Sequence, residues 1–158
     1  MNASTNNLPR KLRATSSGFT LIELMVTIAV LAVIVGIAAP SINTQLANQR
    51  VKSTAATLAN ALKEAKAESI IRRQNLTFNY NNNGTNAGSI NIGNIFSYSY
   101  SAKSTITDSE STNPITFEPS KRVESNTYTI CDENAAATPR QVSVSKIANI
   151  SIKSGGTC

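Results

Sequence analysis

The sequence lacks histidine and tryptophan, and it contains only two cysteines among 158 residues. Without histidine the chain cannot build a Ser-His-Asp or Cys-His nucleophilic pair, nor a metal site that uses a histidine ligand. Cys131 and Cys158 lie too far apart in sequence to form a zinc-binding motif. These absences exclude the histidine-dependent hydrolases and the common zinc modules.

Other catalytic patterns are also missing. No glycine-rich loop connects a strand to a helix, so the sequence offers no phosphate cradle. The acidic residues of the C-terminal half are scattered among polar neighbours, which favours a solvated surface over a glycosidase pair of carboxylates. They are Asp108, Glu110, Glu118, Glu124, Asp132 and Glu133. We therefore predict a non-enzymatic protein without cofactor or metal.

The excess of positive charge is small and unevenly placed. The net charge is +6, but Arg10, Lys11 and Arg13 all precede Gly18 without an acidic residue beside them. The rest of the chain carries 12 cationic against 9 acidic residues. That balance alone does not indicate nucleic-acid binding.

A long apolar run, residues 19–39, follows the basic segment. Every residue in it is apolar or small except Glu23, Thr20 and Thr27. A helix of this length, rising ~1.5 Å per residue, covers the ~30 Å hydrocarbon core of a bilayer. The positive-inside rule places residues 1–18 in the cytoplasm and the chain after residue 39 outside.

Two ordinary interpretations of this run leave features unexplained. A cleaved secretory signal fits the basic start and the small residues near Ala39, but the run is longer than the usual apolar region of 7–15 residues and contains Glu23. A plain signal anchor fits the length, but it leaves Glu23 as an unpaired acid within the membrane. An intramembrane acid calls for a partner.

A third interpretation supplies that partner. The stretch GFTLIEL, residues 18–24, resembles the processing site of type IV pilins and type II secretion pseudopilins. The resemblance implies that a prepilin peptidase cuts between Gly18 and Phe19 and that Phe19 becomes the methylated N-terminus. It also implies that Glu23 pairs with the N-terminal amine of a neighbouring subunit during assembly, and that Pro40 kinks the helix.

After Pro40 the pattern stays helical as far as Arg73, with one narrow apolar stripe. Two arginines, Arg72 and Arg73, are placed to oppose the negative end of the helix dipole. The stripe residues recur at alternating spacings of three and four. They are Val51, Ala55, Leu58, Leu62, Ala65 and Ser69.

The remaining sequence predicts short strands separated by polar turns. Alternation of Leu76, Phe78 and Tyr80 indicates a first strand, and residues 81–88 and 101–113 are predicted to be loops. Further strands are predicted in residues 89–100, 115–118, 127–131, 140–146 and 149–153. The expected fold class is α+β and pilin-like: a long N-terminal helix packed on an antiparallel β-sheet head.

We therefore expect four segments. Residues 1–18 form a cleaved cytoplasmic leader and residues 19–39 a transmembrane and assembly helix. Residues 40–73 form an amphipathic helix and residues 74–158 the β head. Two cysteines in an exported chain favour one disulfide, Cys131–Cys158, which would hold the last strand in place; the alternative is two unpaired thiols.

Within the superfamily, the helix-to-strand passage at residues 58–78 and the strand RQVSVS resemble the group that contains pseudopilin H and the minor pilins FimT and FimU. The resemblance implies a subunit that initiates or caps a pilus tip. Its implied partners are other minor and major pilins, the prepilin peptidase, the inner-membrane assembly platform, and membrane lipid before assembly. The implied location is the inner membrane with the head in the periplasm, then the pilus at the cell surface.

Two alternatives stay open. One is a minor pseudopilin of a type II secretion system, which the processing motif does not distinguish from a pilin. The other is a tip pilin that captures DNA for natural transformation, although the Gly-Arg-x-Arg stretch of such FimT-like relatives is missing here. Contacts to DNA phosphates would then fall to a basic patch. Its candidate residues are Lys121, Arg122, Arg140, Lys146 and Lys153.

Overall fold

The computed structural model describes residues 18–158, apart from the side chains of residues 38–40. The chain divides into two compact units, Met1–Ala38 and Ala39–Cys158. The predicted leader, except for Gly18, lies outside the described residues. The predicted kink depends on the side chain of Pro40, which also lies outside them, and it stays a prediction.

One helix, α1 (Leu21–Arg72), accounts for the helical part of the described chain, close to the predicted range of 19–73. Its C-terminal end is closed by the backbone as well as by charge. Arg73 takes a left-handed conformation (φ 54°), and the N–H of Gln74 donates to the carbonyl of Ser69 at 3.2 Å. This hydrogen bond is that of a Schellman cap, built here without glycine. Arg72 pairs with Glu68 one turn earlier, at 2.6 Å.

No single helix among the described residues is both long and apolar enough to cross a membrane. The segments Leu21–Ile37 and Ser41–Arg72 meet that requirement only when they are taken together as a bent pair. The membrane span expected over residues 19–39 stays a prediction.

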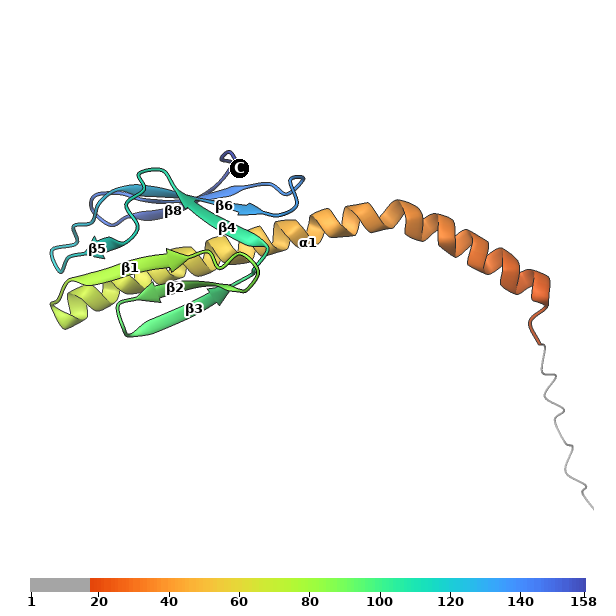
Figure 1. Cartoon of the computed structure of the whole chain (residues 1–158), viewed down its shortest axis with the longest axis horizontal. Coiled ribbons are helices and arrows are strands. Elements are labelled where there is room, and N and C mark those ends of the chain that lie inside the picture. Colours follow the sequence, from red (N-terminus) through yellow and green to blue (C-terminus); the bar gives the residue numbers. More distant parts are fainter. Residues whose placement is uncertain (1–17) are drawn as a thin grey trace, which may run out of the picture. The chain divides into compact units, whose positions relative to one another are not determined.

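Eight strands follow the helix and form two antiparallel sheets of four, both lying along the C-terminal part of α1 (Figure 1). The first sheet has the order β3-β2-β1-β5 and the second the order β4-β6-β7-β8. The strands are β1 (Leu76–Asn81), β2 (Gly88–Ile92), β3 (Phe96–Tyr100), β4 (Ser104–Asp108), β5 (Ile115–Phe117), β6 (Asn126–Asp132), β7 (Arg140–Val144) and β8 (Ile150–Ser154). The predicted α+β class with an antiparallel head is confirmed.

The loop predicted for residues 101–113 is wrong in part, because β4 lies inside it. β4 pairs with β6 over its whole length, from Ser104 opposite Asp132 to Asp108 opposite Tyr128. Its buried residues are Ser104 and Ile106, so one large apolar side chain is its only hydrophobic signal. Pairing with a neighbouring strand, rather than its own apolar periodicity, makes this segment a strand.

The predicted stripe of α1 is confirmed as the side that faces the head. Its six residues, from Val51 to Ser69, are each at most 1% exposed. Ala59 and Ala61 are buried beside them, so the buried side is wider than the predicted stripe. Alanine at these positions lets the strands approach the helix backbone closely.

Aromatic side chains join the two sheets. Tyr128 of β6 is fully buried and meets Phe78 and Tyr80 of β1 edge to face, each with ring centroids 5.9 Å apart. The hydroxyl of Tyr80 donates to Asp108 at 2.9 Å. Burial raises the pKa of Tyr128 above its ordinary range, so the phenol stays neutral inside the core.

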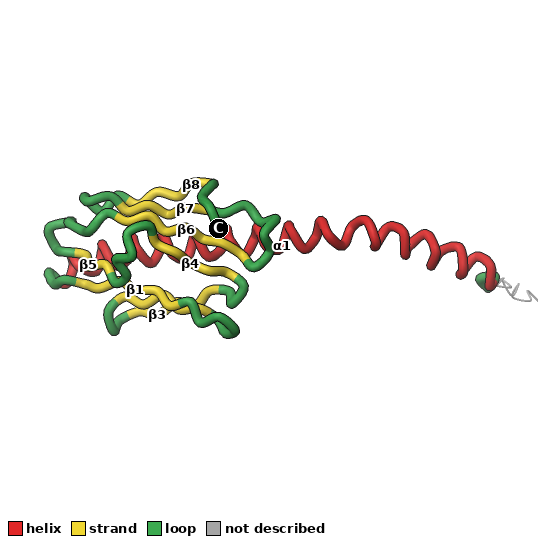
Figure 2. Tube along the Cα trace, turned by 45° about the horizontal axis from the view of Figure 1, so that its top comes forward, coloured by secondary structure: helices red, strands yellow, loops and turns green. Residues whose placement is uncertain are grey.

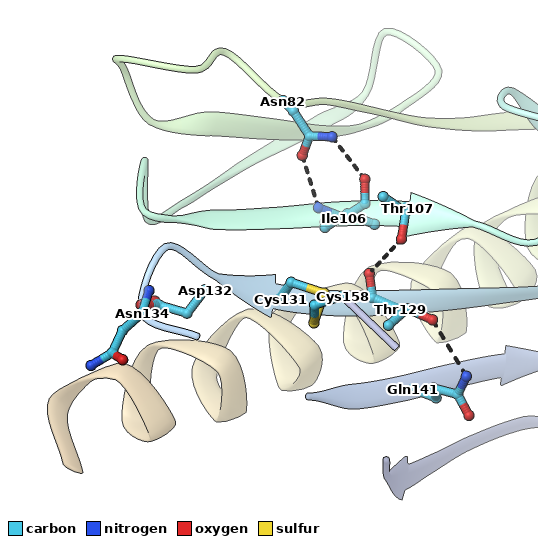
Figure 3. Close-up of a disulfide and its surroundings, with 9 residues drawn as sticks. All are labelled: Asn82, Ile106, Thr107, Thr129, Cys131, Asp132, Asn134, Gln141 and Cys158. Carbon is cyan, nitrogen blue, oxygen red and sulfur yellow. Dashed lines mark hydrogen bonds between the residues drawn. A yellow bond between two sulfur atoms is a disulfide. The ribbon is translucent and has the colours of Figure 1, made fainter. Parts of the chain in front are cut away.

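Two asparagine amides continue the hydrogen bonding where backbone pairing stops. The amide of Asn82 donates to the carbonyl of Ile106 in β4 at 2.7 Å and accepts from its N–H at 2.9 Å (Figure 3). In the same way, Asn113 donates to the carbonyl of Tyr80 at 2.9 Å and accepts from its N–H at 3.3 Å. Each side-chain amide pairs with both the N–H and the carbonyl of one backbone residue, as a neighbouring strand would. Asn82 thereby connects the two sheets, whose strands lie side by side in Figure 2.

The C-terminal tail is tied to β6 by a disulfide between Cys131 and Cys158. Gly155 continues the ladder beyond β8 by donating to the carbonyl of Pro139 at 2.9 Å. A Cβ on Gly156 would lie 2.8 Å from the Thr129 methyl group, so the tail crosses closely over β6 (Figure 3 shows Thr129 beside the disulfide). The predicted pairing of the two cysteines is confirmed.

A bidentate ion pair fastens α1 to the same end of β6. The Nε and one terminal nitrogen of Arg50 each lie 2.8 Å from an oxygen of Asp132, whose side chain is fully buried. Burial by itself raises the pKa of Asp132. Hydrogen bonds from Arg50 and from the N–H of Asn134 outweigh that effect and hold the pKa below its usual range.

We expect this carboxylate to make the head sensitive to acid. Because the folded pKa lies below the unfolded value of about 3.9, its stabilisation is present above that pH and is lost as the pH falls through the folded value. Asp132→Ala should lower the free energy of unfolding by about 3 kcal/mol at neutral pH, since it leaves Arg50 unpaired against the head. In denaturant titrations the difference from wild type should shrink in acid.

The matched control is Glu133→Ala, which removes an exposed pair with Lys103 at 3.5 Å. That loss should be less than about 1 kcal/mol. If both variants lost the same free energy of unfolding, the Arg50–Asp132 pair would not be the stronger contact. If the loss for Asp132→Ala did not change with pH, its carboxylate would not be the source of the acid sensitivity.

The two tail glycines give a second test. Gly155 and Gly156 both have positive φ, at 120° and 116°, but only at Gly156 would a Cβ meet neighbouring atoms. Gly155→Ala should therefore cost backbone strain alone, whereas Gly156→Ala should add about 1–3 kcal/mol for the clash with Thr129. Unfolding of both variants with the disulfide intact measures the difference, and equal losses would show that the tail does not lie against β6.

Candidate assembly site

The predicted assembly residue Glu23 lies in the first turn of α1. Residues 18–20 precede the helix, and the hydroxyl of Thr20 accepts the N–H of Glu23 at 3.2 Å. The N–H of Leu24 donates to the carbonyl of Thr20, also at 3.2 Å. Thr20 is therefore the N-cap, a role that was not predicted from the sequence although TLIE has the spacing of a capping box.

This position suits a carboxylate even before any partner is present. The unpaired N–H groups at a helix N-terminus give it partial positive charge, which favours an acid in the first turn. The sequence has no lysine or arginine between Arg13 and Arg50, so the apolar half of α1 offers Glu23 no cation. A full counter-charge must come from outside that half of the helix.

The same half of α1 is apolar on all sides, and no other described residue covers it. Its large hydrophobic side chains between Phe19 and Ile37 are all 53–79% exposed. Apolar exposure of this extent is typical of a surface that lipid or other protein chains cover. An acid within such a surface needs a partner once it is covered.

The predicted processing residues are accessible. Gly18 lies before the helix, where a Cβ added to it would meet no atom within 4 Å, and Phe19 is 79% exposed. A protease needs access to the bond that it cuts. The described part of the predicted site meets that requirement.

The five cations predicted to contact DNA do not gather in one patch. Lys121 and Arg122 lie in the turn after β5, near Lys146, whose carbonyl accepts the N–H of Val123 at 3.4 Å. Arg122 and Lys146 line one hollow of about 720 Å³. The acids Glu118 and Glu124 line it too, so its charge is mixed.

The other two predicted cations lie on opposite faces of their sheet. Arg140 shares the inner face of β7 with the buried Val142, because side chains two positions apart point the same way. Lys153 of β8 pairs with Gln141, the residue between them, and so belongs to the outer face. Of the five predicted cations, the structure therefore places only Arg122 and Lys146 around one hollow, with Lys121 next to Arg122 in the same turn.

Metal binding has no support in the described part of the chain. No group of three or more Asp, Glu, Cys or His residues among residues 18–158 is placed to hold an ion. Some of the acids there serve other contacts, as Asp132 does with Arg50 and Asp108 with Tyr80.

Comparison with known families gives two matches. Residues 13–39 match the prokaryotic N-terminal methylation motif, and residues 54–147 match the type II transport protein GspH family. The second match covers more than half of the chain and runs from the buried stripe of α1 to the turn after β7. No curated protein is detectably similar in sequence.

Two solved structures resemble the fold. Both are of the type IV minor pilin FimU of Pseudomonas aeruginosa, in two crystal forms, and each is 18% identical to this chain. One superposes with a TM-score of 0.60 and covers 70% of this chain and 96% of FimU. The other gives 0.56, with 68% and 98% covered. At this identity the likeness concerns the fold.

Proposed function

Because the chain belongs to the GspH family of type II transport proteins, we propose that it is a minor type IV pilin that helps to initiate or cap a pilus tip. The family match, the methylation motif and the FimU-like fold support a pilin-like structural subunit.

The precursor is processed at its N-terminus under this proposal. A prepilin peptidase cuts between Gly18 and Phe19, and Phe19 becomes a methylated N-terminal amine. The matched motif covers this bond, and both flanking residues are accessible. Cleavage also removes Arg10, Lys11 and Arg13, which hold the leader on the cytoplasmic side of the membrane.

The observation that carries the proposal is Glu23, one acid on a helix surface that is otherwise apolar and exposed. In the membrane its charge is tolerated near the helix N-terminus, where the cap at Thr20 and the helix dipole favour it. In a fibre the apolar surface is covered by other subunits. The cationic amine of a neighbour's Phe19 then neutralises the carboxylate, and a mismatch in axial position leaves both charges unpaired and buried.

This pairing specifies register as well as affinity. Apolar helices without fixed charges can slide along one another at little cost, whereas two buried opposite charges are stable only when they meet. The partners are other minor and major pilins. The subunit passes from the inner membrane, with its head in the periplasm, to the pilus through the assembly platform.

A secretion role is the second candidate. The matched family is named after a type II transport protein, GspH. The family match therefore supports a minor pseudopilin as directly as it supports a minor pilin. Loss of twitching and of pili on deletion would support the pilin, whereas loss of exported enzymes with normal pili would support the pseudopilin. DNA capture has weaker support, because the predicted phosphate contacts are divided between separate surfaces of the head.

The mature N-terminus tests the class of the protein. Mass spectrometry of the chain from cells should find Phe19 as the first residue, carrying one added methyl group. Gly18→Ala should leave the leader attached, since the peptidase is expected to require glycine immediately before the bond that it cuts. A mature start near Ala39 would instead identify a secreted product of signal peptidase.

Incorporation into pili tests the role of Glu23. Glu23→Ala and Glu23→Gln should each reduce the amount of this subunit in sheared pili by about tenfold or more, because both remove the charge that pairs with the amine. Thr20→Ala is the matched control: it removes the N-cap, worth about 1 kcal/mol, but keeps the carboxylate. If Thr20→Ala were as damaging as Glu23→Gln, helix capping rather than charge pairing would be the role of this turn.

A further inference from the structure

A small groove in the head lies between α1 and the start of β7. It has a volume of about 220 Å³ and is lined by Gln45, Asn48, Gln49, Lys52, Thr138 and Arg140. Five of these side chains can donate hydrogen bonds from nitrogen and Thr138 can donate from its hydroxyl. No carboxylate lines the groove.

The two cations of the groove are not paired elsewhere in the head. Only some cations of the head are engaged, among them Arg50 with Asp132, Arg72 with Glu68, and Lys66 with the carbonyl of Ala148 at 2.8 Å. In the described part of the chain, Lys52 and Arg140 form no ion pair. Arg140 is half-buried on the inner face of β7, where an unpaired guanidinium is less well solvated than at a free surface.

One neutral residue of the groove, Asn48, is oriented as a donor. The side-chain oxygen of Asn48 accepts the N–H of Thr138 at 2.8 Å, so its NH₂ group is the end left for a further partner. The amides of Gln45 and Gln49, one turn apart on α1, can add further N–H groups. The groove therefore combines two positive charges with several neutral donors around a space of small volume.

We propose that this groove binds the carboxylate of an acidic side chain on a neighbouring subunit, an inference that rests on the proposed function as a fibre subunit. The planar guanidinium of Arg140 matches a carboxylate in two hydrogen bonds, and Lys52 adds a second charge. The space is large enough to admit a carboxylate-bearing side chain. Duplex DNA would require a row of cations, since its charges recur every ~1.7 Å along the axis, and the nearest strand cation, Lys153, lies on the other face.

The site would act after Glu23 has brought subunits into axial register. Glu23 fixes the axial position of the helix N-terminus. The groove belongs to the head, so binding there would depend on the rotation of the neighbouring subunit and on whether that subunit carries an acid. A neighbouring subunit without an acid opposite the groove would leave Lys52 and Arg140 unpaired at the interface, which is unfavourable. The groove would thus favour one kind of neighbour over others.

Charge reversal tests the inference in cells that assemble pili. Lys52→Glu and Arg140→Glu should each reduce the subunit in sheared pili about fivefold or more, and the double variant should be little worse than either one because both act at one site. Arg140→Lys should retain most of the incorporation. Lys153→Glu is the matched control on the same pair of strands but on the opposite face, and it should behave as wild type.

A second measurement identifies the occupant. A photo-reactive benzoylphenylalanine in place of Gln49 should crosslink, within purified pili, to a pilin segment that contains Asp or Glu. Changing that acid to Lys should restore incorporation of Lys52→Glu. Crosslinking to a segment without an acid, to a second copy of this chain only, or to DNA would overturn the proposal, as would normal incorporation of both charge-reversed variants.

The outcomes separate this inference from the proposed function. If wild-type chain is present in sheared pili and the charge-reversed variants are equally present, the groove has no such role while the pilin assignment stands. If wild-type chain is absent from pili, the proposed function fails and the inference fails with it. Thermal unfolding and disulfide content of the variants establish that any loss of incorporation is not a loss of folding.

Discussion

The buried side of α1 is the constraint on which the head depends. Among the described residues neither sheet has another apolar layer to cover its inner face, so both pack on the one stripe that runs from Val51 to Ser69. Large side chains such as Leu58 and Leu62 are fully buried in this shared core, beside several alanines. Losing a buried leucine here would leave a cavity in the core that both sheets share, and would therefore weaken the packing of the head.

Polar contacts then decide how the two sheets are held relative to each other. The amide of Asn82 joins the end of β1 to β4, and Tyr80 reaches Asp108 across the same junction. Elsewhere in the second sheet, Arg50 and the Cys131–Cys158 disulfide hold the end of β6 to the helix and to the tail. These contacts lie at the margins of the apolar core, where the strands would otherwise separate first.

Charge has a different use at the two functional regions. Arg50, Arg72 and Lys103 are paired with acids of the head. Other charged residues, including Glu23, Lys52 and Arg140, form no ion pair among the described residues. An unpaired charge at a surface that becomes covered is costly unless the covering molecule supplies the counter-charge. Under the proposed function and the further inference, neighbouring subunits supply the counter-charges for Glu23, Lys52 and Arg140.

Local pattern was enough to predict the helix, its buried stripe, most of the strands and the position of Glu23 near the start of the helix. Each of these rests on periodicity or on spacing within a few residues. Other features depend on the folded chain: that Thr105 and Thr107 belong to a strand, and that Asn82 and Asn113 act as strand partners. The same holds for the groove that Lys52 and Arg140 line and Lys153 does not. The physical reason is that a polar side chain carries no periodic signal. Its role depends on which backbone group or charge, distant in sequence, the fold brings within hydrogen-bond reach.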